Sequence, residues 1–148
     1  MQIFVGADHQ GFQLKSRLVT LLKRAGYEVT DEGDDKLSPD DDFPVFAGKV
    51  VSSVLASDDK DARGILICGS GQGMCIAANR YKGIRACLAY DIQSARSARN
   101  DDDSNVLCLP SSVLKTEAAE SIVRTWLDTP FAGAPRYVRR IRELDDLG

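Results

Sequence analysis

Short apolar runs, rich in β-branched residues, alternate along this chain with amphipathic stretches of about ten to fifteen residues. The runs are nearly continuous in apolar residues and do not alternate regularly with polar ones, as expected for strands that are covered on both faces. The predicted strands are Gln2–Ala7, Tyr27–Asp31, Gly64–Cys68, Ile84–Tyr90 and Asn105–Leu109, and the predicted helices are residues 11–25, 43–57, 72–81, 91–99 and 115–127.

This order of elements predicts an α/β fold, because a strand followed by a helix and a second strand builds a parallel sheet with helical crossovers. We expect one domain over residues 1–148, a three-layer α/β/α Rossmann-like (flavodoxin-like) doubly wound sheet of five parallel strands, with an extra C-terminal helix after Pro130. The flavodoxin-like strand order 2-1-3-4-5 would place the loops after the first and third strands side by side, where such folds bind ligands.

Charge and composition exclude several classes of function. The net charge of −3 and the pI near 5.1 argue against nucleic-acid binding, which needs a basic surface. No apolar run approaches the roughly 20 residues of a membrane span, and the first residues do not resemble a signal peptide, so we expect a cytoplasmic protein without membrane contact. The four cysteines form no CxxC pair and His9 is the single histidine, so no metal site is expected.

The loop after the first predicted strand holds an acid and the only histidine, Asp8 and His9. Its position at the carboxyl end of a strand favours a role in ligand binding. The alternative is that Asp8 caps the following helix and His9 is an ordinary surface residue. A second loop, residues 31–42, is strongly acidic and is expected to be solvated.

The loop after the third predicted strand is Cys68-Gly69-Ser70-Gly71-Gln72-Gly73. Its glycines allow close approach of the backbone to a ligand, and the free N–H groups of the following helix turn toward it. The spacing matches neither a dinucleotide fingerprint nor a P-loop, so the loop is better suited to holding an oxyanion. Cys68 at its edge is either a buried strand-end thiol or, with the glycines attached, a functional group.

Four segments resemble ribose-5-phosphate isomerase B and its relatives, the galactose-6-phosphate isomerase subunits. They are GADHQGFQLK from residue 6, DDFPVFA from residue 41, GILICGSGQGMCIAANRYKGIRACLAYD from residue 64 and NVLCL from residue 105. The resemblance implies a sugar-phosphate isomerase that converts an aldose to a ketose through an enediolate, with no metal and no cofactor. It also implies a homodimer or tetramer whose active sites are shared between subunits.

The resemblance also implies roles for individual residues. Cys68 would move the proton between neighbouring carbons, with Ser70 and the N–H groups of the loop stabilising the enediolate oxygen. The other residues implied to bind substrate are Asp8, His9, Phe43, Gly69, Gly71, Gln72, Gly73, Asp102, Arg136 and Arg140, of which the two arginines would clamp the phosphate. The alternative for the arginines is a solvated helical face.

The sequence departs from the family pattern at three places. Asn100-Asp101-Asp102 stands where the family has Glu-His-Asn, whose histidine opens the sugar ring. Phe43 replaces a tyrosine, and Ser112 replaces an arginine that contacts phosphate. Two hypotheses follow: the substrate is a tetrose phosphate that cannot close a ring, or Asp101 or Asp102 serves as the acid for a cyclic sugar phosphate, which requires a raised pKa.

The sequence also leaves functions other than isomerisation open. A chain with a partial site would also suit a non-catalytic partner subunit or a sugar-phosphate-binding protein of the same family. A redox role is the third alternative, because Cys75 is expected about one helical turn from the Cys68 loop.

Overall fold

The computed structural model describes all 148 residues and has five strands and six helices in the predicted alternation. The strands are β1 (Gln2–Ala7), β2 (Glu28–Asp31), β3 (Arg63–Cys68), β4 (Ala86–Leu88) and β5 (Val106–Pro110). The helices are α1 (Phe12–Arg24), α2 (Phe43–Ala56), α3 (Gln72–Ala78), α4 (Ile92–Asp102), α5 (Thr116–Asp128) and α6 (Pro135–Asp145). The largest difference from the predicted strand bounds is at β4, which is much shorter than Ile84–Tyr90.

All strand pairs are parallel, and the order across the sheet is β2-β1-β3-β5-β4. The predicted fold class is confirmed, but the predicted order of the last two strands is wrong. The reason is apolar burial: every residue of β5 is buried, whereas all three residues of β4 are only partly buried. The more apolar strand therefore takes the inner position, and β4 takes the edge.

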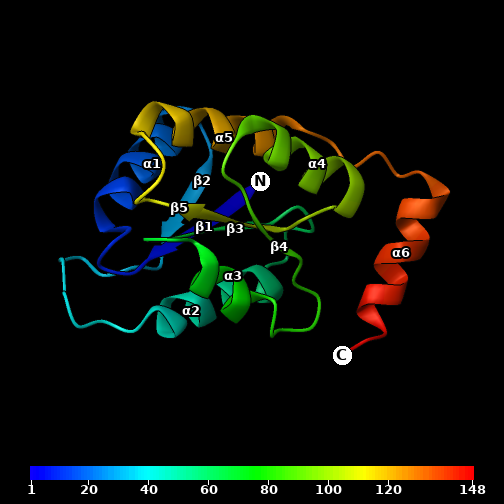
Figure 1. The fold of residues 1–148 in the computed structure, drawn as a ribbon, viewed down its shortest axis with the longest axis horizontal. Coiled ribbons are helices and arrows are strands. Elements are labelled where there is room, and N and C mark those ends of the chain that lie inside the picture. Colours follow the sequence, from blue (N-terminus) through cyan, green and yellow to red (C-terminus); the bar gives the residue numbers. More distant parts are fainter.

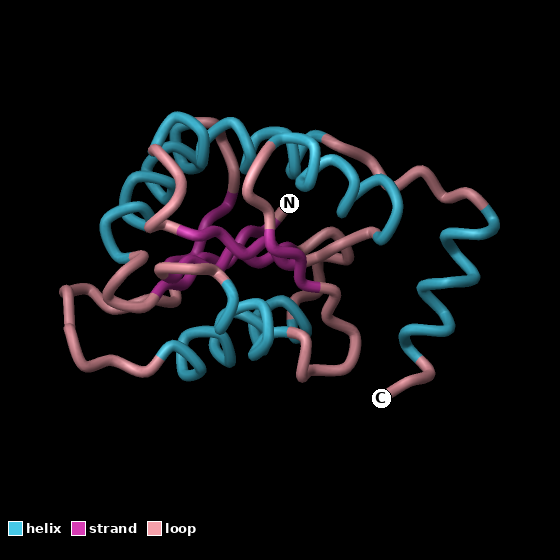
Figure 2. Tube along the Cα trace, viewed as in Figure 1, coloured by secondary structure: helices cyan, strands magenta, loops and turns pink.

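Helices cover both faces of the sheet (Figures 1 and 2). Helices α1, α4 and α5 lie on one face, where a core of 18 buried residues includes Leu18, Ile65 and Trp126. Helices α2 and α3 lie on the other, where a core of 12 buried residues includes Val50, Met74 and Cys68. Cys68 thus belongs to the core beneath α2 and α3, at the end of a strand buried along its whole length.

The C-terminal helix α6 stands apart from these layers at the β4 side of the sheet (Figure 1). It is strongly amphipathic, yet none of its residues is buried. Both arginines implied to bind phosphate, Arg136 and Arg140, belong to this helix and are exposed. An amphipathic helix gains stability by burying its apolar face, and α6 has no such burial within the chain. None of the helices has the length and apolar character needed to cross a membrane.

Candidate active site

Three loops meet at the carboxyl edge of the sheet, after β1, β3 and β5. The N–H of Asp8 donates to the carbonyl of Ile67 at 3.3 Å, which joins the first loop to β3. The hydroxyl of Ser111 donates to the Gln10 carbonyl at 2.9 Å and lies 3.2 Å from the Cys68 carbonyl. The predicted neighbourhood of the β1 and β3 loops is therefore correct. Because β5 lies beside β3, the loop after β5 forms the third wall.

Cys68 is the last residue of β3, and only 6% of it is exposed. Immediately after it the backbone leaves the sheet, so several N–H groups lose their ladder partners. The N–H groups of Gly69, Ser70, Gly71 and Gly73 donate to no group in the protein. A buried thiol next to four unpaired donors is suited to chemistry on an oxygen-rich substrate that develops negative charge.

The shape of this loop depends on Ser70 and Gly71. The Ser70 hydroxyl oxygen accepts the Gln72 N–H at 3.2 Å, at the start of α3, so its own O–H remains available as a donor. Gly71 has a φ of +74°, and a Cβ there would lie 2.5 Å from a methyl group of Leu88. Both the left-handed conformation and the lack of space require glycine at this position.

Phe43, which the resemblance implies to bind substrate, lies over the same loop. It opens α2, is 37% exposed, and its ring is so close to Gly73 that a Cβ there would be 2.8 Å from it. The ring therefore forms an apolar wall beside the unpaired donors of the loop.

The buried carboxylate of Asp8 accepts the backbone N–H groups of Gln10 and Gly11, at 3.0 and 3.1 Å. Asp8 thus shapes the turn into α1, which matches the structural alternative for this residue in part, because Gly11 and not Asp8 holds the N-cap position. His9 lies beside it with its Nδ1 atom 2.9 Å from Oδ1 of Asp41.

Asp41 was missed by the sequence analysis, which treated the acidic loop 31–42 as solvated. That interpretation is wrong for this residue, since only 8% of the Asp41 side chain is exposed. The wrong assignment has a physical cause: a run of acids has the composition of a solvated loop, and only the fold shows which carboxylate turns inward. The available signal was the DDFPVFA motif, of which Asp41 is the first residue.

The remaining predicted residues lie at the opposite edge of the sheet. Asp101 and Asp102 end α4, which runs back from the carboxyl edge toward the start of β5. There Nε of Arg85, the residue before β4, donates to the Asp102 carbonyl at 2.9 Å, and the Asn100 amide donates to Asp101 Oδ1 at 2.8 Å. Within one chain the structure therefore does not bring Asp101, Asp102, Arg136 or Arg140 to Cys68.

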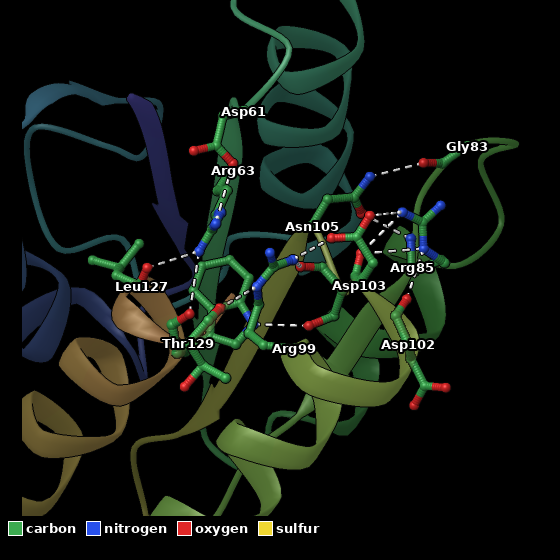
Figure 3. Close-up of polar contacts among 12 residues, drawn as sticks. Asp61, Arg63, Gly83, Arg85, Arg99, Asp102, Asp103, Asn105, Leu127 and Thr129 are labelled. Carbon is green, nitrogen blue, oxygen red and sulfur yellow. Dashed lines mark hydrogen bonds and ion pairs between the residues drawn. The ribbon is translucent and has the colours of Figure 1, made fainter. Parts of the chain in front are cut away.

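Burial, and then the charge of Asp101, raises the pKa of Asp102 above that of an ordinary aspartate, against the opposing effects of Arg85 and Arg140. Figure 3 shows its carboxylate pointing away from Arg85. Of the two acids considered as replacements for the family histidine, Asp102 thus has the shift in the required direction.

Next to these acids is a buried arginine cluster, defined by Arg63 and Arg99 and shown in Figure 3. Arg99 donates to Asp103 Oδ1 at 2.8 Å and to the Ser104 carbonyl at 2.6 Å, while Arg63 donates to two carbonyls at the end of α5. These buried guanidinium groups join α4, α5 and the sheet, which assigns them a structural role.

A pocket of about 650 Å³ also lies at this end. It is lined by the segment 79–87 and by α4 and the C-terminal end of α6, including Arg85, Asp102 and Leu144. Cys68 and its loop do not border it. The Cys68 loop and this pocket, which Asp102 lines, are therefore at different edges of the sheet in the isolated chain.

Cys75 lies one helical turn after the loop, with its N–H donating to the Gly71 carbonyl at 3.1 Å. A hydrogen bond with the Cys108 thiol of β5 lowers the pKa of Cys75 to about 7, with burial opposing the shift. All four cysteines are free thiols. The Cys75 thiol also donates to the Ala86 carbonyl at 3.5 Å and accepts from the Asn79 amide at 3.6 Å, and Cys68 is not among its partners.

Comparison with known proteins identifies the family. A family model described as Ribose/Galactose Isomerase matches residues 3–144. The chain is 39% identical over 142 residues to the probable ribose-5-phosphate isomerase B of Mycoplasma pneumoniae, covering 96% of this chain and 91% of that protein.

Two solved structures are similar along nearly the whole chain. Ribose 5-phosphate isomerase B of Thermotoga maritima gives a TM-score of 0.93 at 44% identity, covering 99% of this chain and 98% of that one. Ribose-5-phosphate isomerase B of Mycoplasma genitalium, solved with bound ribulose-5-phosphate, gives 0.94 at 39% identity, covering 98% and 94%.

The chain belongs to the ribose/galactose isomerase family. Within that family its similarity is to ribose-5-phosphate isomerase B, as the four sequence motifs predicted. The predicted enzyme class, sugar-phosphate isomerase, is confirmed.

The loop geometry predicts that Gly71→Ala is more destabilising than Gly133→Ala. Both glycines have a positive φ, but a Cβ at Gly133 meets no atom within 4 Å, whereas one at Gly71 meets Leu88 and the backbone of Leu109. We expect a loss of about 2–4 kcal/mol in unfolding free energy for Gly71→Ala and about 1 kcal/mol for Gly133→Ala, measured by denaturant unfolding. Equal losses would show that crowding does not hold the loop in place.

Proposed function

We propose that this protein interconverts the aldose and ketose forms of a small sugar phosphate, with Cys68 as the base. The observation that carries the proposal is the buried Cys68 thiol beside the unpaired N–H groups of Gly69, Ser70, Gly71 and Gly73. Binding alone does not require a thiol at that place, whereas proton transfer between two carbons requires a base next to donors that stabilise the resulting enediolate.

Cys68 and the loop that follows it can supply each proton transfer that the reaction requires. The Cys68 thiolate takes the proton from C2 of the aldose, and the electron pair of the C–H bond forms the C1–C2 double bond of an enediolate. The charge that develops on O1 is stabilised by the N–H donors, of which one is typically worth about 3 kcal/mol. The thiol then returns the proton to C1, while the O2 proton passes to O1 and leaves the ketone at C2.

Ser70 is suited to the second proton movement. Its oxygen accepts the Gln72 N–H, which fixes the side chain and leaves the hydroxyl proton free to donate to a substrate oxygen. The backbone N–H groups therefore stabilise the negative charge of the enediolate, and Ser70 exchanges a proton with the substrate hydroxyls.

We infer that a second copy of the chain completes the site. The phosphate clamp Arg136 and Arg140 lies on a helix without buried residues, at the edge of the sheet opposite Cys68. A symmetric dimer would bring α6 of one protomer over the Cys68 edge of the other and bury its apolar face. A pair of guanidinium groups four residues apart on one helix is suited to a phosphate dianion.

Replacing Cys68 tests the base. We expect Cys68→Ala to lower kcat by about 10²–10⁴-fold while the affinity for the sugar phosphate, measured by calorimetry, changes little. The matched control is Cys87→Ala on the edge strand β4, because burial raises the pKa of Cys87 to about 11 and keeps it protonated.

A kcat for Cys68→Ala within a few-fold of the unmutated enzyme would contradict the assignment of the base. If the unmutated protein binds sugar phosphates but turns over none, the alternative of a partner subunit or sugar-phosphate-binding protein is the better one.

Mixed dimers test the shared site. Cys68→Ala and Arg140→Ala protomers are each expected to be nearly inactive alone. When both are coexpressed, half of the randomly formed dimers are mixed, and each mixed dimer has one intact site of two, so about a quarter of the unmutated activity should return. Recovery no greater than the mean of the two single variants would mean that Cys68 and Arg140 act within the same chain.

The substrate is tested with a panel of aldose and ketose phosphates of four to six carbons, in the presence of EDTA. A four-carbon aldose 4-phosphate cannot close a furanose ring, so it needs no ring-opening histidine. Since Asp101 stands at the family histidine position, we expect a higher kcat/KM for the four-carbon substrate than for ribose 5-phosphate. Equal or better use of ribose 5-phosphate would contradict this and make Asp102, whose pKa is raised, the candidate acid.

A further inference from the structure

The single histidine of the chain is held by an aspartate from a distant loop. Nδ1 of His9 lies 2.9 Å from Oδ1 of Asp41, and the backbone N–H of His9 donates to the same oxygen at 3.1 Å. Two bonds to one carboxylate oxygen fix both the main chain and the ring of His9. The acidic loop is thereby attached to the loop after β1.

The two ends of this pair differ in exposure. The Asp41 carboxylate is 8% exposed, whereas the His9 side chain is 32% exposed. Nε2 of His9 has no hydrogen-bond partner in the protein. The Asp41 carboxylate is therefore buried, whereas Nε2 of His9 is accessible and unpaired. In this arrangement the outer nitrogen is oriented and available to donate a hydrogen bond to a ligand.

His9 is also the only possible cation in the parts of these loops that adjoin Cys68, since Lys115 lies at the far end of the loop after β5, directly before α5. Residues 8–11, 69–73 and 110–112 contain no lysine and no arginine, and Ser112 stands where the family pattern has an arginine. A Cβ at Gly69 would meet the Gln10 side chain and the Ser112 hydroxyl, so the neighbour of His9 touches the oxyanion loop directly.

The groups facing His9 favour its charged form. The hydrogen bond that the ring of His9 makes to the Asp41 carboxylate is the largest cause and raises the pKa of His9. Burial opposes it as the second cause, and the negative charges of Asp8, Asp41 and Asp40 raise the pKa further. No cation contributes to the shift. A raised pKa means that the imidazolium persists to higher pH than for an unpaired histidine.

We propose that Asp41 is a positioning residue that holds His9 as an oriented imidazolium, whose Nε2–H donates to an anionic oxygen of the bound sugar phosphate. The proposal rests on the proposed function for the identity of the ligand, but not for the pairing itself. Asp41 acts through His9 without touching the substrate.

The first test is a titration of His9 by ¹⁵N-resolved NMR, in which a single histidine gives an unambiguous signal. Asp41→Asn keeps the shape of the side chain and removes its charge, so the pKa of His9 should fall. The matched control is Asp40→Asn, because Asp40 acts on His9 by charge alone and should produce a smaller fall. Equal falls, or none in Asp41→Asn, would overturn the role of Asp41.

The second test is the pH dependence of KM. At a pH between the two titration midpoints, His9 is charged in the unmutated enzyme and neutral in Asp41→Asn, so KM should rise about tenfold with kcat nearly unchanged. At a pH below both midpoints the imidazolium is present in both proteins and the difference in KM should vanish. A defect of the same size at both pH values, or one in kcat, would show a merely structural role.

The third test does not need turnover. Inorganic phosphate added to the unmutated protein should shift the His9 signal and raise its titration midpoint, and the effect should weaken in Asp41→Asn. A His9 signal that responds neither to phosphate nor to a sugar phosphate would overturn the ligand contact. Because these readouts are independent of catalysis, absence of isomerase activity with a responsive His9 would count against the proposed function only.

Discussion

The structure depends on the burial of β3 between β1 and β5. All six residues of this strand are buried, and it pairs in parallel register with both neighbours. Apolar contact on both faces fixes its position and leaves no freedom at its carboxyl end. Cys68 is the last residue held in this way, so the glycine loop begins from a rigid point, and its N–H groups are turned out of the sheet together. The arrangement of donors around the thiol follows from that one strand.

The same architecture divides the candidate site. In a parallel α/β fold each helix returns the chain to the amino edge of the sheet, so residues at the end of a helix and residues at the end of a strand lie on opposite sides. Cys68 and His9 belong to strand ends, whereas Asp101 and Asp102 end α4. The protruding helix α6, which has no buried residues, is the element that the proposed dimer would share between protomers.

Electrostatics at the two edges are organised differently. At the amino edge, Asp103 balances the charge of the buried Arg99, and Arg63 and Arg99 donate to carbonyl groups, which stabilises the junction of α4, α5 and the sheet. At the carboxyl edge, several backbone N–H groups and the Nε2 atom of the His9 imidazole are left without partners in the protein. Polar groups that already have hydrogen-bond partners stabilise the fold, and the N–H groups without partners are available to bind a ligand.

The sequence by itself determined the fold class, the bounds of most elements and the family. The periodicity of apolar residues is a local property of the chain, and the segment around Cys68 has many residues in common with the family. The order of β4 and β5 was decided by tertiary structure, since it depends on which apolar strand gains more from an inner position. The same holds for Asp41, which was one acid among several in the sequence and turns inward only because the loop packs against His9. The separation of Cys68 from Asp101 and Arg140 likewise could not be predicted from the sequence, because similarity of motifs indicates the roles of residues but not the distances between them.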